Sequence, residues 1–168
     1  MGRKRITQKR IGKKEQRKIN ILIAKLKTYR IFSNMKKQRE NEFNNRLMDH
    51  LRQNPNPLEV NNVGIPAPVF VGETFRPEFY LGSKKKPLCA VECKRLTEHT
   101  AKARWKEALS QTLLYSEIYK SVIAVLLDFT SDARYHRAFG KGNNPETRFA
   151  KRLREQENIQ IIVLKPAN

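Results

Sequence analysis

Two short motifs in the middle of the chain combine residue types that could perform chemistry. Pro77-Glu78 is followed, after thirteen intervening residues, by Glu92-Cys93-Lys94. Glu92 and Lys94 lie two positions apart in an apolar stretch, so a β-strand would place both side chains on one face. The Glu-x-Lys pattern by itself also fits a surface strand with a cross-strand ion pair. Its place at the end of an apolar strand favours a site, because charges there are costly unless they have partners or a function.

A β-hairpin would bring the carboxylates of Glu78 and Glu92 together. Residues of paired antiparallel strands lie roughly 5–8 Å apart. Two carboxylates at that distance repel each other unless a cation lies between them. We therefore expect Mg²⁺ or Mn²⁺ to be held by Glu78, Glu92 and the backbone carbonyl of Cys93. The ammonium of Lys94 would then hold an attacking water or stabilise negative charge that develops on a phosphate.

Periodicity and turn residues predict the elements that would position this hairpin. A helix with an apolar stripe should end at Asn54-Pro55-Asn56-Pro57, since proline lacks an amide donor and disfavours helix in the residue before it. In chain order we expect a helix over 36–53, strands over 69–71, 75–81 and 88–94, a helix over 100–119, a strand over 121–130, a helix from 145 and a strand over 159–164. The segment 82–86 is typical of a hairpin turn, and 131–144 of a long loop. This order predicts an α/β (α+β mixed) fold, in which a central mixed sheet is flanked by helices.

The motifs and the order of elements together resemble the PD-(D/E)xK nuclease superfamily, over about residues 36–166. This superfamily includes restriction endonucleases, archaeal-type Holliday junction resolvases, RecB-type nucleases and some homing endonucleases. The resemblance implies a restriction-endonuclease-like core, with Glu78 and Glu92 as metal ligands and Lys94 as the catalytic lysine. Glu78 departs from the more common aspartate of the family, which leaves open whether the site keeps full activity.

The resemblance also implies a third metal ligand from the first helix of the core. Glu40 stands three and seven residues before the apolar Phe43 and Leu47, so all three would lie near one helix face. An ordinary solvated glutamate fits the same position. Glu42 is the competing choice, but its apolar neighbours are in the wrong register.

Gln111 and Tyr115 are four residues apart on the helix that follows the motif. Their spacing resembles the Gln-x-x-x-Tyr signature of RecB-type nucleases. The resemblance implies a catalytic role for Gln111 and a place for Tyr115 close to the nucleic acid.

Basic and aromatic residues around the motifs are expected to bind nucleic acid, although a solvated basic surface would look the same. After the active strand and in the long loop, they are Arg95, Lys102, Arg104, Lys106, Arg134, Tyr135, Arg137 and Lys141.

The charge of the chain is unevenly distributed. Its 35 Lys and Arg exceed its 16 Asp and Glu by 19, and residues 1–39 carry fifteen of these bases and one acid. We therefore expect a basic N-terminal extension over 1–35, with a short amphipathic helix over 18–32, and a nuclease-like domain over 36–168. Such an extension favours nucleic acid as partner; a solubilising tail, an RNA-binding arm and a binder of anionic membranes are the alternatives.

Cysteine usage and hydropathy bear on the compartment. Cys89 and Cys93 are too few for a disulfide framework or a zinc site, and indicate buried thiols in a reducing compartment. No apolar run approaches the roughly 20 residues of a membrane span. We expect an intracellular protein, either cytoplasmic or associated with the nucleoid.

The leading hypothesis is a metal-dependent DNA endonuclease, either site-specific (homing or restriction type) or junction-resolving. Cutting both strands needs two active sites, which favours a homodimer or higher homo-oligomer. The second hypothesis is a non-catalytic DNA- or RNA-binding protein on a degenerate nuclease fold. A ribosome-associated basic protein would explain the basic arm, but it leaves the face of Glu78, Glu92 and Lys94 without a role.

Overall fold

A mixed sheet of five strands organises the chain, in a computed structural model that describes residues 10–53, 55–140 and 142–167. The strands lie in the order β1-β4-β5-β6-β7. β4 is antiparallel to β1 and β5, whereas β5, β6 and β7 are parallel. Their bounds are β1 (Val60–Asn61), β4 (Phe79–Ser83), β5 (Lys86–Leu96), β6 (Ser121–Asp128) and β7 (Ile159–Leu164). The prediction of a mixed α/β fold is confirmed at this level.

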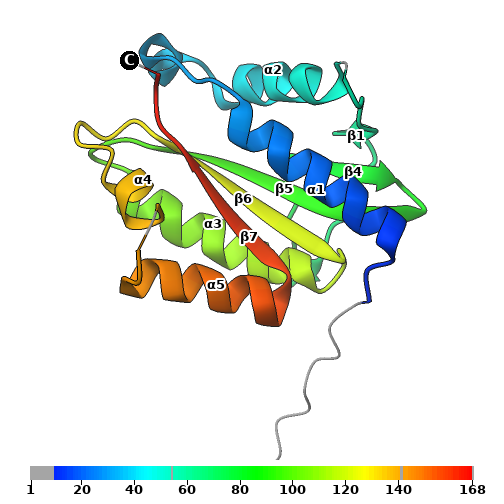
Figure 1. The fold of residues 1–168 in the computed structure, drawn as a ribbon. Coiled ribbons are helices and arrows are strands. Elements are labelled where there is room, and N and C mark those ends of the chain that lie inside the picture. The colour runs from blue at the N-terminus through cyan, green and yellow to red at the C-terminus, as the bar shows by residue number, and fades with distance from the viewer. Residues whose placement is uncertain (1–9, 54, 141, 168) are drawn as a thin grey trace, which may run out of the picture.

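Helices cover both faces of the sheet (Figure 1). On one face lie α1 (Lys13–Thr28) and α2 (Glu40–Arg52), joined through a short 3-10 helix, η1 (Ser33–Lys37). On the other face lie α3 (Ala101–Ser116), α4 (Arg134–Ala138) and α5 (Pro145–Glu157). Each parallel pair of strands is connected through a helix of this second face, as a parallel connection requires.

The alternation of side chains along β5 decides which residues face which helices. Cys89, Val91 and Cys93 are buried in the core beneath α1 and α2. Ala90 packs in the core on the opposite side, towards α3. Glu92 and Lys94 have the same parity as Ala90 and contact residues of α3. The strand β6 is buried along its whole length, as its apolar run predicts, because helices cover both of its faces.

The first helix belongs to the core of the domain. Ile19, Leu22 and Leu26 are buried in the same cluster as α2 and the sheet. The boundary predicted at residue 35 is therefore not a boundary in packing. The helix also begins at Lys13, five residues before the predicted start, because the carboxylate of Glu15 accepts a hydrogen bond from the amide of Gly12 and stabilises the first turn.

Four predicted segments differ in the structure. The stretch 36–53 is divided between η1 and α2. The segment 69–71 does not join the central sheet: β2 (Val69–Phe70) and β3 (Glu73–Thr74) form a separate exposed hairpin, whose turn has Val71 and Gly72 at positive φ. The loop 131–144 contains α4. The strand predicted over 75–81 begins only at Phe79 and runs to Ser83. Three other predictions hold, since Asn144 caps α5, the last strand spans 159–164, and Cys89 and Cys93 are buried free thiols.

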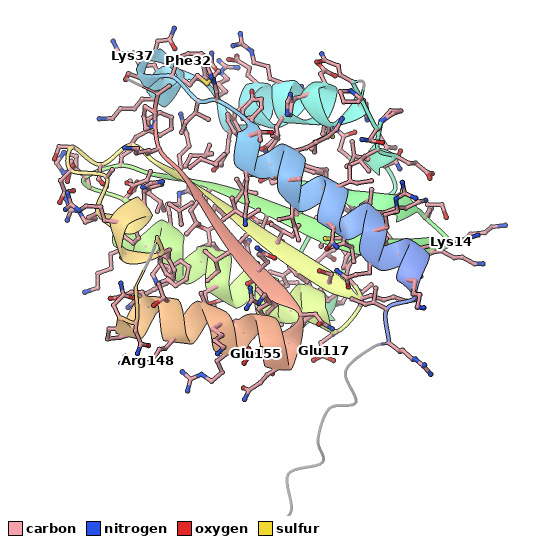
Figure 2. The ribbon with its side chains drawn as sticks, viewed as in Figure 1. Lys14, Phe32, Lys37, Glu117, Arg148 and Glu155 are labelled. Atoms are coloured by element: carbon pink, nitrogen blue, oxygen red, sulfur yellow. The ribbon has the colours of Figure 1, made fainter. Side chains whose placement is uncertain are left out.

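Basic side chains lie on the outer surface of the α1 and η1 layer. Figure 2 shows Lys14 and Lys37 directed away from the sheet. Within the described ranges, no helix has the length and apolarity needed to cross a bilayer.

Candidate functional site

A buried lysine lies between two carboxylates at the carboxyl end of β5. The Nζ of Lys94 is 2.7 Å from Oε1 of Glu92 and 3.2 Å from Oε1 of Glu107 on α3. Glu92 is 1% exposed and Lys94 is 5% exposed. Arg104 binds the other oxygen of Glu107, with Nη1 at 2.9 Å from Oε2. The two charges predicted to share one strand face therefore form a buried ion pair, which α3 extends towards the surface.

The second oxygen of Glu92 is fixed by α3. The hydroxyl of Tyr115 donates to Oε2 of Glu92 at 3.0 Å, and Tyr115 is fully buried. With Lys94 on one oxygen and Tyr115 on the other, the Glu92 carboxylate has a defined orientation. A buried carboxylate held in this way is costly to create and rigid once formed.

Glu78 stands at the start of β4, where the hairpin register would place it opposite Glu92. Phe79 is paired with Val91, and the amide of Glu78 donates to the carbonyl of Val91 at 3.1 Å. From α2, the side-chain amide of Asn44 donates to Oε2 of Glu78 at 2.6 Å. Glu78 is thus held through its amide by the neighbouring strand β5 and through its side chain by α2.

The electrostatics connect these groups. Burial raises the pKa of Glu92 to about 7, although the ammonium of Lys94 opposes the shift. Burial also raises the pKa of Glu78, with Lys94 again opposing it and Glu40 adding to it. Burial would lower the pKa of Lys94, but the charge and hydrogen bond of Glu92 raise it overall. Burial thus favours the protonated form of both carboxyl groups, and a nearby cation would favour the ionised form.

Three side-chain oxygens in the described part of the chain are buried without a hydrogen-bond donor, on Gln38, Asn44 and Gln111. Asn44 Oδ1 belongs to the side chain that binds Glu78. Gln111 lies one turn of α3 from both Glu107 and Tyr115, the two residues that contact Lys94 and Glu92. An orphaned buried acceptor is unfavourable by about 1–3 kcal/mol and calls for a missing donor, water or cation.

The carbonyl of Cys93 lies on the same edge of β5 as Glu78. Val91 presents its carbonyl to Glu78, and backbone groups alternate along a strand, so Cys93 presents its carbonyl on that side too. β4 begins at Phe79 and does not extend to the position opposite Cys93. Within the described residues, no three Asp, Glu, His or Cys side chains are grouped closely enough to hold a metal ion on their own. A cation here would also need backbone, amide or water oxygens.

Glu40 contributes to the site through its charge. It is half-buried at the first position of α2, and its charge raises the pKa of Glu78 and of Arg104. It lies one helical turn before Asn44.

Two residues predicted to bind nucleic acid have structural partners. Tyr115 is buried and donates to Glu92, so it cannot reach a nucleic acid in this structure, and we correct its role to orienting the carboxylate. The guanidinium of Arg95 donates to the carbonyls of Lys36 and Gln38, which corrects its role from binding substrate to anchoring the segment that leads into α2.

The remaining predicted contacts are at the surface. Lys102 and Lys106 are exposed on α3, on the turns around Arg104. Arg134 pairs with Glu98 and Asp132, and Arg137 with Asp132. Tyr135 is half-buried against the core beneath α3 and α4. Lys141 lies outside the described residues.

Sequence reasoning missed Asn44 and Glu107. Both could have been found from helical spacing, because Asn44 is four residues after Glu40, and Glu107 is four residues before Gln111. Their residue types alone carry no signal in a chain this rich in polar side chains.

Comparison with models of known protein families, with curated proteins and with solved structures finds no match.

Proposed function

We propose that this chain is a divalent-metal-dependent endonuclease that hydrolyses phosphodiester bonds in DNA, on a core of the PD-(D/E)xK type. The observation that carries the proposal is the buried pair of Glu92 and Lys94 facing Glu78. A domain that needed only stability would do as well or better with apolar residues at these positions.

The residues present fit a hard divalent cation such as Mg²⁺ or Mn²⁺. Glu78, Glu92 and the carbonyl of Cys93 would hold it, and the orphaned oxygens of Asn44 and Gln111 are the kind of neutral ligand or water acceptor that such an ion uses. When bound, the ion would polarise a phosphate and lower the pKa of a water. Glu40 would act through such a water, since its charge already acts on Glu78.

Lys94 supplies the positive charge that the protein itself contributes. The ammonium of Lys94 contacts two carboxylates, those of Glu92 and Glu107. If Glu92 bound a cation, the ammonium would still be paired with Glu107. An ammonium in this position can hold a water nucleophile or bind an oxygen on which negative charge develops. Tyr115 keeps the Glu92 carboxylate in one orientation during that step.

The net charge of +19 supports a polyanionic substrate. DNA is the substrate class we propose, with cleavage of both strands by a homodimer or higher oligomer. Lys102, Arg104 and Lys106 on α3 would contact the phosphates beside the site.

A non-catalytic nucleic-acid binder is the competing function. The chain of ion pairs from Glu92 through Lys94 and Glu107 to Arg104 is complete without any ligand, which suits a structural role. Against it, acids at the centre of a site repel phosphate and give a pure binder no advantage.

Cleavage of supercoiled, linear and branched DNA separates the two functions. The wild type should cut in Mg²⁺ and not in EDTA, and Lys94→Met should lose activity by about 100-fold or more while it still binds DNA. Lys84→Met is the matched control, because it removes an exposed lysine from the turn between β4 and β5, at the far end of β5 from Lys94. Tight binding without cutting in Mg²⁺ or Mn²⁺ would establish the binder instead.

A further inference from the structure

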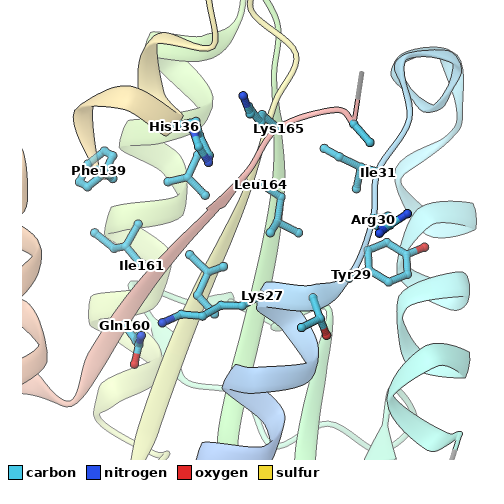
Figure 3. A pocket seen from close by; sticks show the side chains of 14 residues that line it. Lys27, Tyr29, Arg30, Ile31, His136, Phe139, Gln160, Ile161, Leu164 and Lys165 are labelled. Carbon is cyan, nitrogen blue, oxygen red and sulfur yellow. The ribbon is translucent and has the colours of Figure 1, made fainter. Parts of the chain in front are cut away.

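The outer edge of β7 is unpaired along most of its length. β7 is the last strand of the sheet, and the edge away from β6 lies in a groove between the end of α1 and the α4 region (Figure 3). The groove has a volume of about 670 Å³. Exposed strand edges are normally short, carry inward-pointing charged side chains or are covered by another element, because their free backbone groups can pair with another strand.

The hydrogen-bond pattern between β6 and β7 identifies which backbone groups of β7 point away from β6. The amide of Val122 donates to the carbonyl of Asn158, so in a parallel ladder the even-numbered residues of β7 face β6. Ile161, Val163 and Lys165 then direct their N–H and C=O groups outward. The C-terminal end shows the same phase, because the amide of Ala167 donates outward to the carbonyl of Ile31 at 2.8 Å. Among the described residues, no backbone or side-chain group bonds the outward groups of Ile161 and Val163.

The segment after α1 has already begun an additional strand at this edge. Ile31 forms a parallel bridge with Pro166, just beyond the end of β7. The open stretch from Ile161 to Lys165 spans about 13 Å at the usual strand rise, enough for about five residues of an incoming chain.

The groove is positively charged as well as apolar. Lys27 and Arg30 lie on its α1 side and Lys165 at its end, and His136 and Phe139 form the opposite wall (Figure 3). The lining residues that the structure describes include no Asp or Glu. An occupant should therefore carry acids towards α1 and apolar side chains towards Phe139.

We propose that the β7 edge binds an extended acidic peptide segment of another protein as a sixth strand of the sheet. The backbone of the segment would pair with Ile161, Val163 and the N–H of Lys165, whose C=O is taken by the bridge of Ile31 with Pro166, and alternating acidic side chains would face Lys27 and Arg30. This inference does not rest on the proposed nuclease activity, because it uses a different edge of the sheet.

Other occupants match the groove less well. A second copy added edge to edge would bring the same lysines and arginine close to one another across the interface, where like charges repel. Residues 1–9 of the chain contain four Lys or Arg and no acid, so they carry the wrong charge. A nucleic acid would satisfy the cations but cannot donate and accept at alternate peptide groups as a strand does.

Fluorescence anisotropy with a labelled peptide, Val-Glu-Val-Glu-Val, tests the proposal on the full chain. Binding should weaken by about tenfold or more when the peptide is N-methylated on the residues that pair, when lysine replaces glutamate in the peptide, and in Lys27→Glu with Arg30→Glu. Val163→Pro should have a similar effect, because proline lacks the outward N–H that would donate to the incoming peptide. Lys84→Glu with Lys85→Glu, exposed in the turn between β4 and β5 outside the groove, is the control and should keep most of the affinity.

Three results would overturn the proposal. The first is no binding at about 1 mM peptide, or equal binding of the N-methylated peptide, which would reduce the effect to charge. The second is that oligothymidylate displaces the peptide and that the variant Lys27→Glu with Arg30→Glu binds oligothymidylate more weakly than the wild type does. This result would make the groove a nucleic-acid surface. The third is that light scattering detects a dimer of the wild type but not of the same double variant. This result would make the β7 edge an interface between two copies of the chain. If Val163→Pro fails to fold by circular dichroism, the charge variant and the N-methylated peptide still decide the matter.

Discussion

Replacing Glu92 by glutamine should change how the stability of the domain depends on pH. Glu92 is almost fully buried, and burial raises its pKa from an ordinary 4.5 to about 7. Its pKa in the folded state thus lies above that in the unfolded state. Stability linked to this group is therefore fully present below about pH 4.5 and is lost as the pH rises through 7.

The size of the effect follows from the shift. A tenfold change in proton affinity corresponds to about 1.4 kcal/mol, so ionising Glu92 in the folded protein lowers the free energy of unfolding by about 3 kcal/mol between acidic and mildly alkaline pH. Glu92→Gln removes this titration while the other groups stay. The difference in free energy of unfolding, variant minus wild type, should therefore become more positive by about 3 kcal/mol from pH 4 to pH 8.

Urea unfolding at each pH measures that difference. The single tryptophan, Trp105, is packed against Phe139 with ring centroids 5.1 Å apart, and its fluorescence reports on unfolding of the α3 layer. Glu73→Gln, at an exposed position of β3, is the control and should give a nearly constant difference. A constant difference for Glu92→Gln as well would refute the reasoning, because it would mean that Glu92 titrates in the folded protein as it does in the unfolded chain.

Three further predictions concern the rest of the molecule. Leu22→Ala should lower the free energy of unfolding by about 2–5 kcal/mol, because Leu22 is fully buried where α1 packs on the domain; a loss below about 1 kcal/mol in urea unfolding would show that α1 is dispensable for the core. Asn144→Ala should cost about 1 kcal/mol, since the Asn144 side chain accepts from the amide of Thr147 at the start of α5, whereas Asn143→Ala should cost little; equal losses in thermal unfolding would count against the cap. DNA affinity of Lys14→Gln with Arg17→Gln, both exposed on α1, should fall, and the slope of log affinity against log salt should become shallower by about 0.9 for each phosphate that the variant no longer neutralises; an unchanged slope would place the DNA elsewhere.

The order of the main elements could be predicted from the sequence because the strongest local signals agree with the fold. The apolar run of β6 and the sequence Asn144-Pro145-Glu146 are read correctly, since burial on both faces and helix capping are local requirements. The hairpin of β4 and β5 also follows from its turn. The strand predicted over 69–71 forms as β2, but in a separate hairpin and not in the central sheet, because β-prone residues do not show which sheet a strand will join.

Contacts between elements that are distant in the sequence could not be predicted. The packing of α1 depends on the same apolar stripe that would suit a second copy or DNA, so only the three-dimensional core decides it. Within the site, the Glu92–Lys94 pair was foreseen from strand parity. Helical spacing from Glu40 and Gln111 could have marked Asn44 and Glu107 as candidates. Their contacts with Glu78 and Lys94 depend on how α2 and α3 are placed against the sheet, which local periodicity does not specify.

Binding of Mn²⁺, followed by electron paramagnetic resonance, tests the central claim most directly. We expect about one tightly bound ion per wild-type chain, and loss of this ion both in Glu78→Gln and in Glu92→Gln, with Glu73→Gln unaffected. If the wild type binds no Mn²⁺, or if both site variants keep the ion with unchanged affinity, then Glu78 and Glu92 do not form a metal site and the nuclease proposal is contradicted.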